Sequence, residues 1–230
     1  PVPLAIFTAN TVCIYDSVNF VNNSTISSGI LTYSWDLGDG TISSQQNIVH
    51  SYSTSGSFNV TLVATSDSGC TDSLSQLIFV NPAPNAAFTS NNNCLYDTSF
   101  FNNNSTINSG NITVWNWNFG DGTVSSVANP YHIYSAAGVY TVTLIAISDS
   151  GCTDTTINQI EKYPVPISNF SPTTVCLNDS TQFADLSTIS GGSLVGWSWN
   201  FGDGTIANQQ NPFHFFPLGF LVICGHARRV

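Results

Sequence analysis

The stretch Trp35-Asp36-Leu37-Gly38-Asp39-Gly40 decides the fold of this chain. It returns, with small changes, as Trp117-Asn118-Phe119-Gly120-Asp121-Gly122 and as Trp199-Asn200-Phe201-Gly202-Asp203-Gly204. Side chains two residues apart on a strand point to the same face, so the Trp and the Leu or Phe of each copy are predicted to anchor a core. The Gly-Asp-Gly that follows is typical of a tight hairpin, because glycine adopts positive φ and Asp bonds to nearby backbone amides.

The copies of this stretch are 82 residues apart, and other residues keep the same interval. These residues are Trp35, Trp117 and Trp199; His50, His132 and His214; and Gly40, Gly122 and Gly204. A period of this length fits a whole small domain and is too long for a solenoid unit. We therefore predict three tandem domains, at residues 1–81, 82–163 and 164–230.

The composition indicates a folded chain with an unusual surface. Hydrophobic residues make up 42% and aromatic residues 12%, which is enough to build cores, whereas charged residues make up only 7%. The formal net charge of −10 would repel a nucleic-acid backbone, so we exclude that class of partner. No signal peptide, transmembrane span or lipidation motif is visible in the sequence.

Within a repeat, the hydrophobic pattern has a period of two residues. The segment 139–147 alternates β-branched and aromatic residues with other residues, and the segment 58–64 repeats this pattern. Further short strands are expected at 100–101, 114–117 and 157–160, separated by Gly, Asn, Asp or Pro. About seven short strands in a domain of this size predict an all-β fold of tandem immunoglobulin-like sandwiches.

Six cysteines indicate an oxidising compartment. Repeats one and two each carry an early and a late cysteine at equivalent positions, Cys13 and Cys70 in the first and Cys94 and Cys152 in the second. Pairing within a repeat, Cys13–Cys70 and Cys94–Cys152, is the simplest of about 15 connectivities. Each bond would close a loop worth about 4 kcal/mol of chain entropy. We therefore expect an extracellular or cell-surface protein.

Three elements that follow one another in repeats one and two resemble the PKD (polycystic kidney disease) domain family. They are the Trp-Asp-Phe-Gly-Asp-Gly-like hairpin, the His-x-Tyr elements 50–52 and 132–134, and the Gly-Val-Tyr-Thr-Val-Thr-Leu strand 138–144. The added cysteines and the Ser-Asp-Ser-Gly-Cys-Thr-Asp segments 66–72 and 148–154 are similar to PKD repeats of secreted Bacteroidota proteins. The resemblance implies an extracellular spacer, adhesive or assembly module with no catalytic residue and no cofactor.

The repeated His and Asp residues invite a metal or catalytic interpretation, which we do not favour. Each repeat holds one of the equivalent histidines, so packing and hydrogen bonding are their expected roles. A calcium site needs six or more oxygen ligands, and two repeats carry Asn in place of Asp36. We therefore expect the aspartates of the hairpins to cap turns, and we predict no metal site.

Two kinds of motif predict covalent glycans. Sequons occur at Asn22, Asn23, Asn59, Asn103, Asn104, Asn111 and Asn178, of which we take Asn22, Asn59, Asn104, Asn111 and Asn178 as candidate acceptors. Asp-Ser/Thr-x motifs that resemble the Bacteroidota O-glycosylation signal place further candidates at Ser17, Ser73, Thr155 and Ser180. A surface with so few charges needs another protection against edge-to-edge association, and glycans would provide it.

The third repeat follows the template only as far as residue 216. The segment 220–223 could form a strand, but the last strand of the sandwich is missing, and Cys224 is not a clear equivalent of the late cysteines. One interpretation is a fragment or an altered gene end. The other is an open sheet edge that a neighbouring chain fills by strand addition, which would build a filament because the contact does not close.

The leading functional hypothesis is an extracellular structural protein, a rigid array of β-sandwiches that self-associates head to tail into a surface filament and carries glycans. Two alternatives remain. The chain could be an adhesin fragment that binds glycan or protein, for which Trp115 and Trp197 are the aromatic residues to inspect, although a regular strand places each on the same face as its neighbouring core Trp. It could also be a set of accessory domains of a larger secreted hydrolase.

Overall fold

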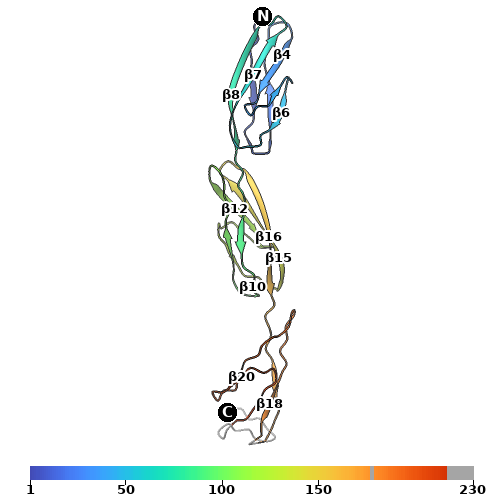
Figure 1. Ribbon diagram of the computed structural model, residues 1–230, viewed down its shortest axis with the longest axis vertical. Helices are drawn as coiled ribbons and strands as arrows, with labels where there is room; N and C mark the ends of the chain where they lie inside the picture. The colour runs from blue at the N-terminus through green and yellow to red at the C-terminus, as the bar shows by residue number, and fades with distance from the viewer. Residues whose placement is uncertain (177–178, 217–230) are drawn as a thin grey trace. The chain divides into compact units, whose positions relative to one another are not determined.

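A computed structural model describes residues 1–176 and 179–216, and every regular element in these residues is a β-strand (Figure 1). The strands expected within these residues are all present, and the two longest predicted segments are longer than expected, at Gly56–Ser66 (β7) and Gly138–Ser148 (β15). The described part of the chain holds no helix of the length and hydrophobicity that crossing a bilayer requires. The prediction of an all-β fold is confirmed.

The first repeat forms two sheets. The five-stranded sheet has the order β2 (Val12–Cys13), β8 (Thr71–Asn81), β7, β4 (Leu31–Asp36) and β5 (Ile42–Ser43); the three-stranded sheet has the order β1 (Phe7–Ala9), β3 (Ser17–Asn22) and β6 (Ile48–Ser51). Neighbouring strands in these two sheets pair antiparallel, except β2, which runs parallel to the last residues of β8. Figure 1 shows the long strands β7 and β8 running along the length of this repeat.

The second repeat has the same topology. Its five-stranded sheet has the order β10 (Asn93–Cys94), β16 (Thr153–Tyr163), β15, β12 (Ile112–Asn118) and β13 (Val124–Ser125); its three-stranded sheet has the order β14 (Tyr131–His132), β11 (Ser99–Asn103) and β9 (Phe88–Ser90). The parallel strand is repeated as well, since β10 pairs with the last two residues of β16. The predicted immunoglobulin-like sandwich is thus confirmed in both repeats.

The third repeat is incomplete within the described residues. It has a three-stranded sheet of β17 (Phe170–Pro172), β18 (Thr181–Asp185) and β21 (Phe213–His214), and a two-stranded sheet of β19 (Trp199–Asn200) and β20 (Ile206–Ala207). No strand among residues 179–216 corresponds to the long pair β7 and β8 of the first repeat. The strand expected at 220–223 lies outside the described residues.

An aromatic cluster recurs at the centre of each repeat. In the first repeat the ring of Phe7 meets the edge of Trp35 at 5.1 Å between centroids, and Phe20 lies 5.9 Å from the same ring. The corresponding distances are 5.1 and 5.7 Å in the second repeat and 5.4 and 5.8 Å in the third. The Trp and the residue two positions later are buried in repeats one and two, as the sequence predicted.

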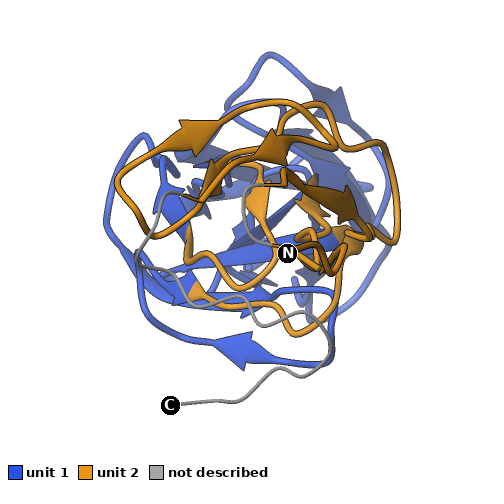
Figure 2. Ribbon diagram, turned by 90° about the horizontal axis from the view of Figure 1, so that it is seen from below, with its two compact units in different colours: residues 1–90, 100–131, 141–159 blue, residues 91–99, 132–140, 160–230 orange. Residues whose placement is uncertain are grey.

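The chain divides into two compact units, which Figure 2 colours separately. One unit comprises residues 1–90, 100–131 and 141–159, and the other comprises residues 91–99, 132–140 and 160–230. The division passes through the second repeat, because β15 and β16 have residues in both units. The domain boundaries at 81/82 and 163/164 stay a prediction from the sequence.

Candidate functional site

A disulfide joins the first repeat to the second. Cys13 is the last residue of β2, and Cys152 lies in the turn immediately before β16. Their Cα atoms are 5.6 Å apart, which is an ordinary separation for a disulfide. The bond spans 139 residues of sequence, so it constrains the two repeats together and leaves each sandwich without an internal crosslink among the described residues.

The predicted pairing within each repeat is therefore wrong, and strand geometry explains why. Cys13 lies opposite Asn81, the last residue of β8, whereas Cys70 precedes Thr71, its first residue. Eleven residues of extended strand place these cysteines roughly 35 Å apart, and a disulfide requires Cα atoms within about 7 Å. Cys94 lies opposite the last residue of the 11-residue β16, so the proposed bond to Cys152 fails for the same reason.

The remaining cysteines differ in state. Cys70 is a half-buried free thiol, and Cys94 is an exposed free thiol. Cys176 is disulfide-bonded. Cys224 lies outside the described residues.

The aspartates and asparagines of the hairpins cap turns, as predicted. In the first repeat Asp36 Oδ1 accepts a hydrogen bond from the Gly38 amide and Asp39 Oδ1 accepts one from the Thr41 amide, both at 2.9 Å. Equivalent pairs of bonds occur in the second and third repeats at 2.9–3.0 Å. Because Asn118 and Asn200 make the same bond as Asp36, the oxygen matters here and the charge does not.

In the first and third repeats, a histidine side chain contacts the hairpin aspartate of its own repeat. His50 Nε2 lies 2.7 Å from Asp39 Oδ2, and His214 Nε2 lies 2.8 Å from Asp203 Oδ2. Burial raises the pKa of Asp39, but hydrogen bonds from His50 and Thr41 outweigh it, so its pKa lies below the ordinary value. Hydrogen bonds from Thr205, and then from His214, lower the pKa of Asp203 to about 2. The predicted hydrogen-bonding role is confirmed for these two histidines.

A buried tyrosine supports the same hairpin in the first repeat. The edge of the His50 ring packs on Tyr52 with 4.7 Å between centroids, and the Tyr52 hydroxyl donates a hydrogen bond to the Leu37 carbonyl at 2.9 Å. Burial, followed by the nearby Asp39 charge, raises the pKa of Tyr52 to about 12. The His-x-Tyr element therefore holds the hairpin onto the core. In residues 1–176 and 179–216, no group of three or more His, Cys, Asp or Glu side chains could hold a metal ion.

Most candidate glycan acceptors lie at the surface. The exposed ones are Ser17, Ser73, Thr155, Ser180, Asn59, Asn104 and Asn111. Asn22 is different, because its Nδ2 atom, the site of N-glycosylation, is buried. Asn178 lies outside the described residues. The acid in two of the Asp-Ser/Thr motifs has a structural role of its own, since Asp72 accepts the Ala5 amide at 2.8 Å and Asp154 accepts the Ala86 amide at 2.7 Å.

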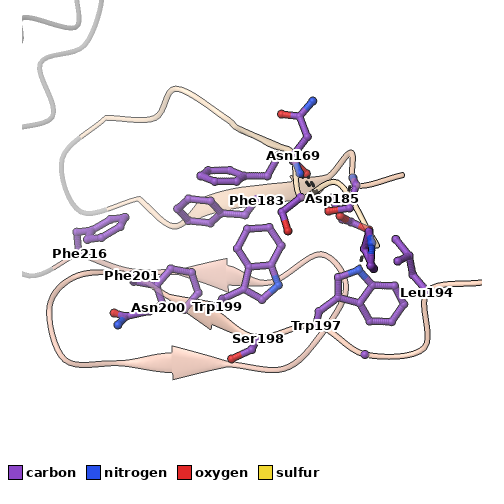
Figure 3. A pocket seen from close by; sticks show the side chains of 15 residues that line it. Asn169, Phe183, Asp185, Leu194, Trp197, Ser198, Trp199, Asn200, Phe201 and Phe216 are labelled. Carbon is purple, nitrogen blue, oxygen red and sulfur yellow. Dashed lines mark hydrogen bonds between the residues drawn. The ribbon is translucent and has the colours of Figure 1, made fainter. Parts of the chain in front are cut away.

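The third repeat contains an open aromatic pocket of about 590 Å³ (Figure 3). Figure 3 shows Phe183, Trp199 and Phe201 gathered in it, with Trp197 farther along. The exposed fraction of Phe170, which also lines the pocket, is 53%, whereas its equivalents Phe7 and Phe88 are 1% and 5% exposed. In the first repeat β7 covers this surface, with Leu62 paired opposite Trp35. Among the described residues of the third repeat, no strand takes the corresponding place beside Trp199.

The two tryptophans considered for glycan binding do not form an exposed platform. Trp115 and Trp117 lie on one face of β12, as strand parity predicts, and Trp115 is half-buried. Trp197 is half-buried too, and its Nε1 donates to Asp185 Oδ2 at 2.7 Å, the bond drawn in Figure 3. The bond to Asp185 gives the Trp197 ring a structural role.

A buried lysine was not predicted from the sequence. Lys162 has a relative exposure of 1%, and its Nζ donates to Asn93 Oδ1, to the Asp97 carbonyl at 3.0 Å and to Ser99 Oγ at 3.2 Å. Burial lowers the pKa of Lys162. The first repeat has Val80 at this position, so Lys162 replaces a core residue and binds the segment that runs from β10 to the first residue of β11. A Lys at the position that is Val80 in the first repeat was its only signal in the sequence.

These observations define the class of the protein as a tandem immunoglobulin-like β-sandwich array. The sequence profile of the PKD domain family matches residues 1–80 and again residues 79–161, so the chain belongs to the PKD domain family. The predicted resemblance is confirmed.

Curated relatives share a part of this chain. The pre-pro-metalloprotease PrtV of Vibrio cholerae serotype O1 is 32% identical over 116 residues, which are 50% of this chain and 13% of that protein. The microbial collagenase of Vibrio alginolyticus is 36% identical over 87 residues, or 37% of this chain and 11% of that protein. Among solved structures, the PKD1 domain of Vibrio anguillarum Epp is 34% identical, covers 36% of this chain and 95% of its own, and has a TM-score of 0.34. The aligned regions are thus small parts of the curated relatives.

Proposed function

We propose that this chain is an extracellular, non-catalytic spacer in which the first two PKD repeats are locked together covalently. The observation that carries this proposal is the Cys13–Cys152 disulfide. A crosslink within a sandwich would stabilise that sandwich alone, whereas a crosslink between repeats limits their relative motion. A restricted joint is what a spacer needs in order to hold its two ends apart.

The relatives favour an accessory role for this spacer in a longer secreted protein. The similar regions belong to a metalloprotease and to a collagenase, and each is a small part of that protein. A disulfide fits an oxidising compartment outside the cytoplasm. We propose that the chain is a non-catalytic part of such a protein, because its repeated His and Asp side chains hydrogen-bond within the hairpins.

The spacer proposal predicts a narrow distribution of distances between the two repeats. Donor and acceptor dyes would be attached through unnatural amino acids at Ser44 and Ser126, which are exposed and occupy equivalent positions. We expect single-molecule energy transfer to give one narrow population in the oxidised chain and a broad one in Cys152→Ser, because the variant frees the joint.

Cys70→Ser is the matched control and should leave the narrow population unchanged, because Cys70 is free. A peptide map under non-reducing conditions must also contain the Cys13–Cys152 linkage. Equal widths in the oxidised chain and in Cys152→Ser, or absence of that linkage, would contradict the proposal.

A second candidate function is self-assembly by strand addition, and the pocket of the third repeat favours it. The exposed Phe170 ring marks a core surface that β7 and β15 cover elsewhere. We propose that a strand from a second copy fills this place, which would give an open-ended filament because donor and acceptor surfaces differ.

Strand addition can be tested with a labelled peptide of the β15 sequence, residues 138–148. We expect it to bind the chain and the fluorescence anisotropy of the label to rise. The reason is that Val142, Leu144 and Ala146, at every second position, form one apolar face that is buried in the core of the second repeat. A peptide with these three residues changed to Ser is the control. Binding of both peptides to the same extent, or of neither, would rule out a specific strand site.

We also propose that the surface carries glycans. The exposure of Ser17, Ser73, Thr155 and Ser180 supports O-linked modification, and the exposure of Asn59, Asn104 and Asn111 leaves these amides available. The buried Nδ2 atom argues against Asn22 in the folded protein. The peptide map described above would identify each modified residue by its added mass.

A further inference from the structure

The two free thiols, Cys70 and Cys94, are register equivalents of the two bonded cysteines. Cys70 corresponds to Cys152 in the turn before the last long strand, and Cys94 corresponds to Cys13 at the end of the short parallel strand. Each free thiol therefore occupies a position that forms a disulfide in the other repeat.

The turn around Cys70 has the geometry of the turn around Cys152. The Cys70 amide donates to Ser66 Oγ at 3.0 Å, and the Cys152 amide donates to Ser148 Oγ at the same distance. The cysteine carbonyls accept the Ser66 and Ser148 amides at 2.8 and 2.9 Å. The preceding glycines have φ values of 82° and 83°. The half-buried Cys70 is thus held as the bonded Cys152 is held.

The segment around Cys94 likewise matches the segment around Cys13. Cys13 lies opposite Asn81 and Cys94 lies opposite Tyr163, each at the last position of the long neighbouring strand. The two cysteine carbonyls accept amides three residues later at 3.1 and 3.2 Å, and the tyrosines between them have φ values of 72° and 70°. A tyrosine held at positive φ is uncommon, so this shared turn is specific to the motif.

We propose that Cys94 and Cys70 are the open halves of a second inter-repeat disulfide, completed between two copies of this chain. Cys94 of one copy bonds to Cys70 of the next, which reproduces the Cys13–Cys152 pairing across a molecular boundary. The two halves lie on different surfaces, so the linkage is heterologous and can propagate. This inference rests on the proposed spacer function and names the partner as another copy.

The chemistry is an oxidation of two thiols. The Cys94 and Cys70 thiols together lose two protons and two electrons as the S–S bond forms. A low-molecular-weight disulfide such as oxidised glutathione accepts them and leaves as two molecules of glutathione, by thiol–disulfide exchange through a mixed disulfide.

Two complementary variants of the full chain test the proposal. Cys70→Ser retains only the Cys94 half, and Cys94→Ser retains only the Cys70 half. Each variant is incubated at high concentration with reduced and oxidised glutathione, alone and mixed, and analysed by non-reducing electrophoresis and peptide mapping. We expect the mixture to give a dimer linked Cys94–Cys70, in about tenfold excess over the statistical share expected from unselective thiols.

Two outcomes would overturn the proposal: no dimer in the mixture, or Cys94–Cys94 dimers as abundant as Cys94–Cys70 dimers. Unchanged tryptophan fluorescence of each variant shows that the fold is intact. The same peptide map contains the Cys13–Cys152 linkage. Its presence without the Cys94–Cys70 linkage rejects this inference alone, whereas its absence rejects the spacer proposal.

Discussion

Reducing the Cys13–Cys152 disulfide is expected to lengthen the extensible chain by roughly 450–500 Å when the protein is pulled from its two ends, because the bond spans 139 residues and each extended residue adds about 3.3–3.6 Å. In the oxidised protein the force passes from Cys13 directly to Cys152. Every strand from β3 to β15 lies between these cysteines and is shielded from the load.

Single-molecule force spectroscopy with and without a reductant measures this length directly. Cys152→Ser should give the long trace without a reductant, and Cys70→Ser should keep the short trace, because Cys70 takes no part in the bond. If the oxidised chain and Cys152→Ser extend to the same length, the crosslink between repeats does not exist. The predicted difference is far larger than any change expected from altered folding stability.

The sequence predicts the fold of this protein well because each local signal agrees with the others. The Trp-x-Leu/Phe spacing, the Gly-Asp-Gly turn and the alternating strand that follows all indicate the same hairpin-rich sandwich. The capping bonds of Asp36 and Asp39 and the burial of Trp35 then follow from strand parity and turn chemistry. The hydrogen-bonding role of His50 is predictable as well. It is the only histidine of the first repeat, so no second histidine is available there for a metal site or for catalysis.

The disulfide pairing was not predictable in the same way. The interval between cysteines identifies equivalent positions, but it does not say at which end of a strand each position lies. The parallel pairing of β2 with the last residues of β8 decides this, and a two-residue strand leaves no periodic signal in the sequence. Knowledge of that one pairing would have excluded Cys13–Cys70 and left the bond between repeats as the natural alternative.

Lys162 shows a second limit of prediction from sequence. Its position is apolar in the first repeat, and a charged side chain there conflicts with the local pattern. Its three hydrogen-bond acceptors come from 93–99, more than sixty residues away in the sequence. Such compensation depends on tertiary contacts, so it becomes visible only when the loop and the strand are placed side by side.

The first glycine of the Gly-Asp-Gly turn is expected to tolerate substitution far less well than the second. Gly120 and Gly122 both have positive φ, 83° and 91°, so an alanine at either position is strained by the backbone. A Cβ atom at Gly120 would also lie 2.6 Å from the Thr141 carbonyl oxygen, whereas one at Gly122 would meet nothing within 4 Å. The two substitutions share the strain and differ in the clash.

We therefore expect Gly120→Ala to destabilise the second repeat by about 3 kcal/mol and Gly122→Ala by about 1 kcal/mol. For a domain of this size, the larger loss lowers the melting temperature by on the order of 15 °C. Thermal unfolding followed by tryptophan fluorescence measures both shifts.

The first repeat offers a replicate of this comparison. A Cβ atom at Gly38 would lie 2.9 Å from backbone atoms of Asn59, and one at Gly40 would meet nothing within 4 Å. Gly38→Ala should therefore resemble Gly120→Ala, and Gly40→Ala should resemble Gly122→Ala. Similar losses for both glycines of a pair would show that φ alone sets the requirement. A larger loss at the first glycine in both repeats would show that close packing of the hairpin on β7 and β15 also requires it.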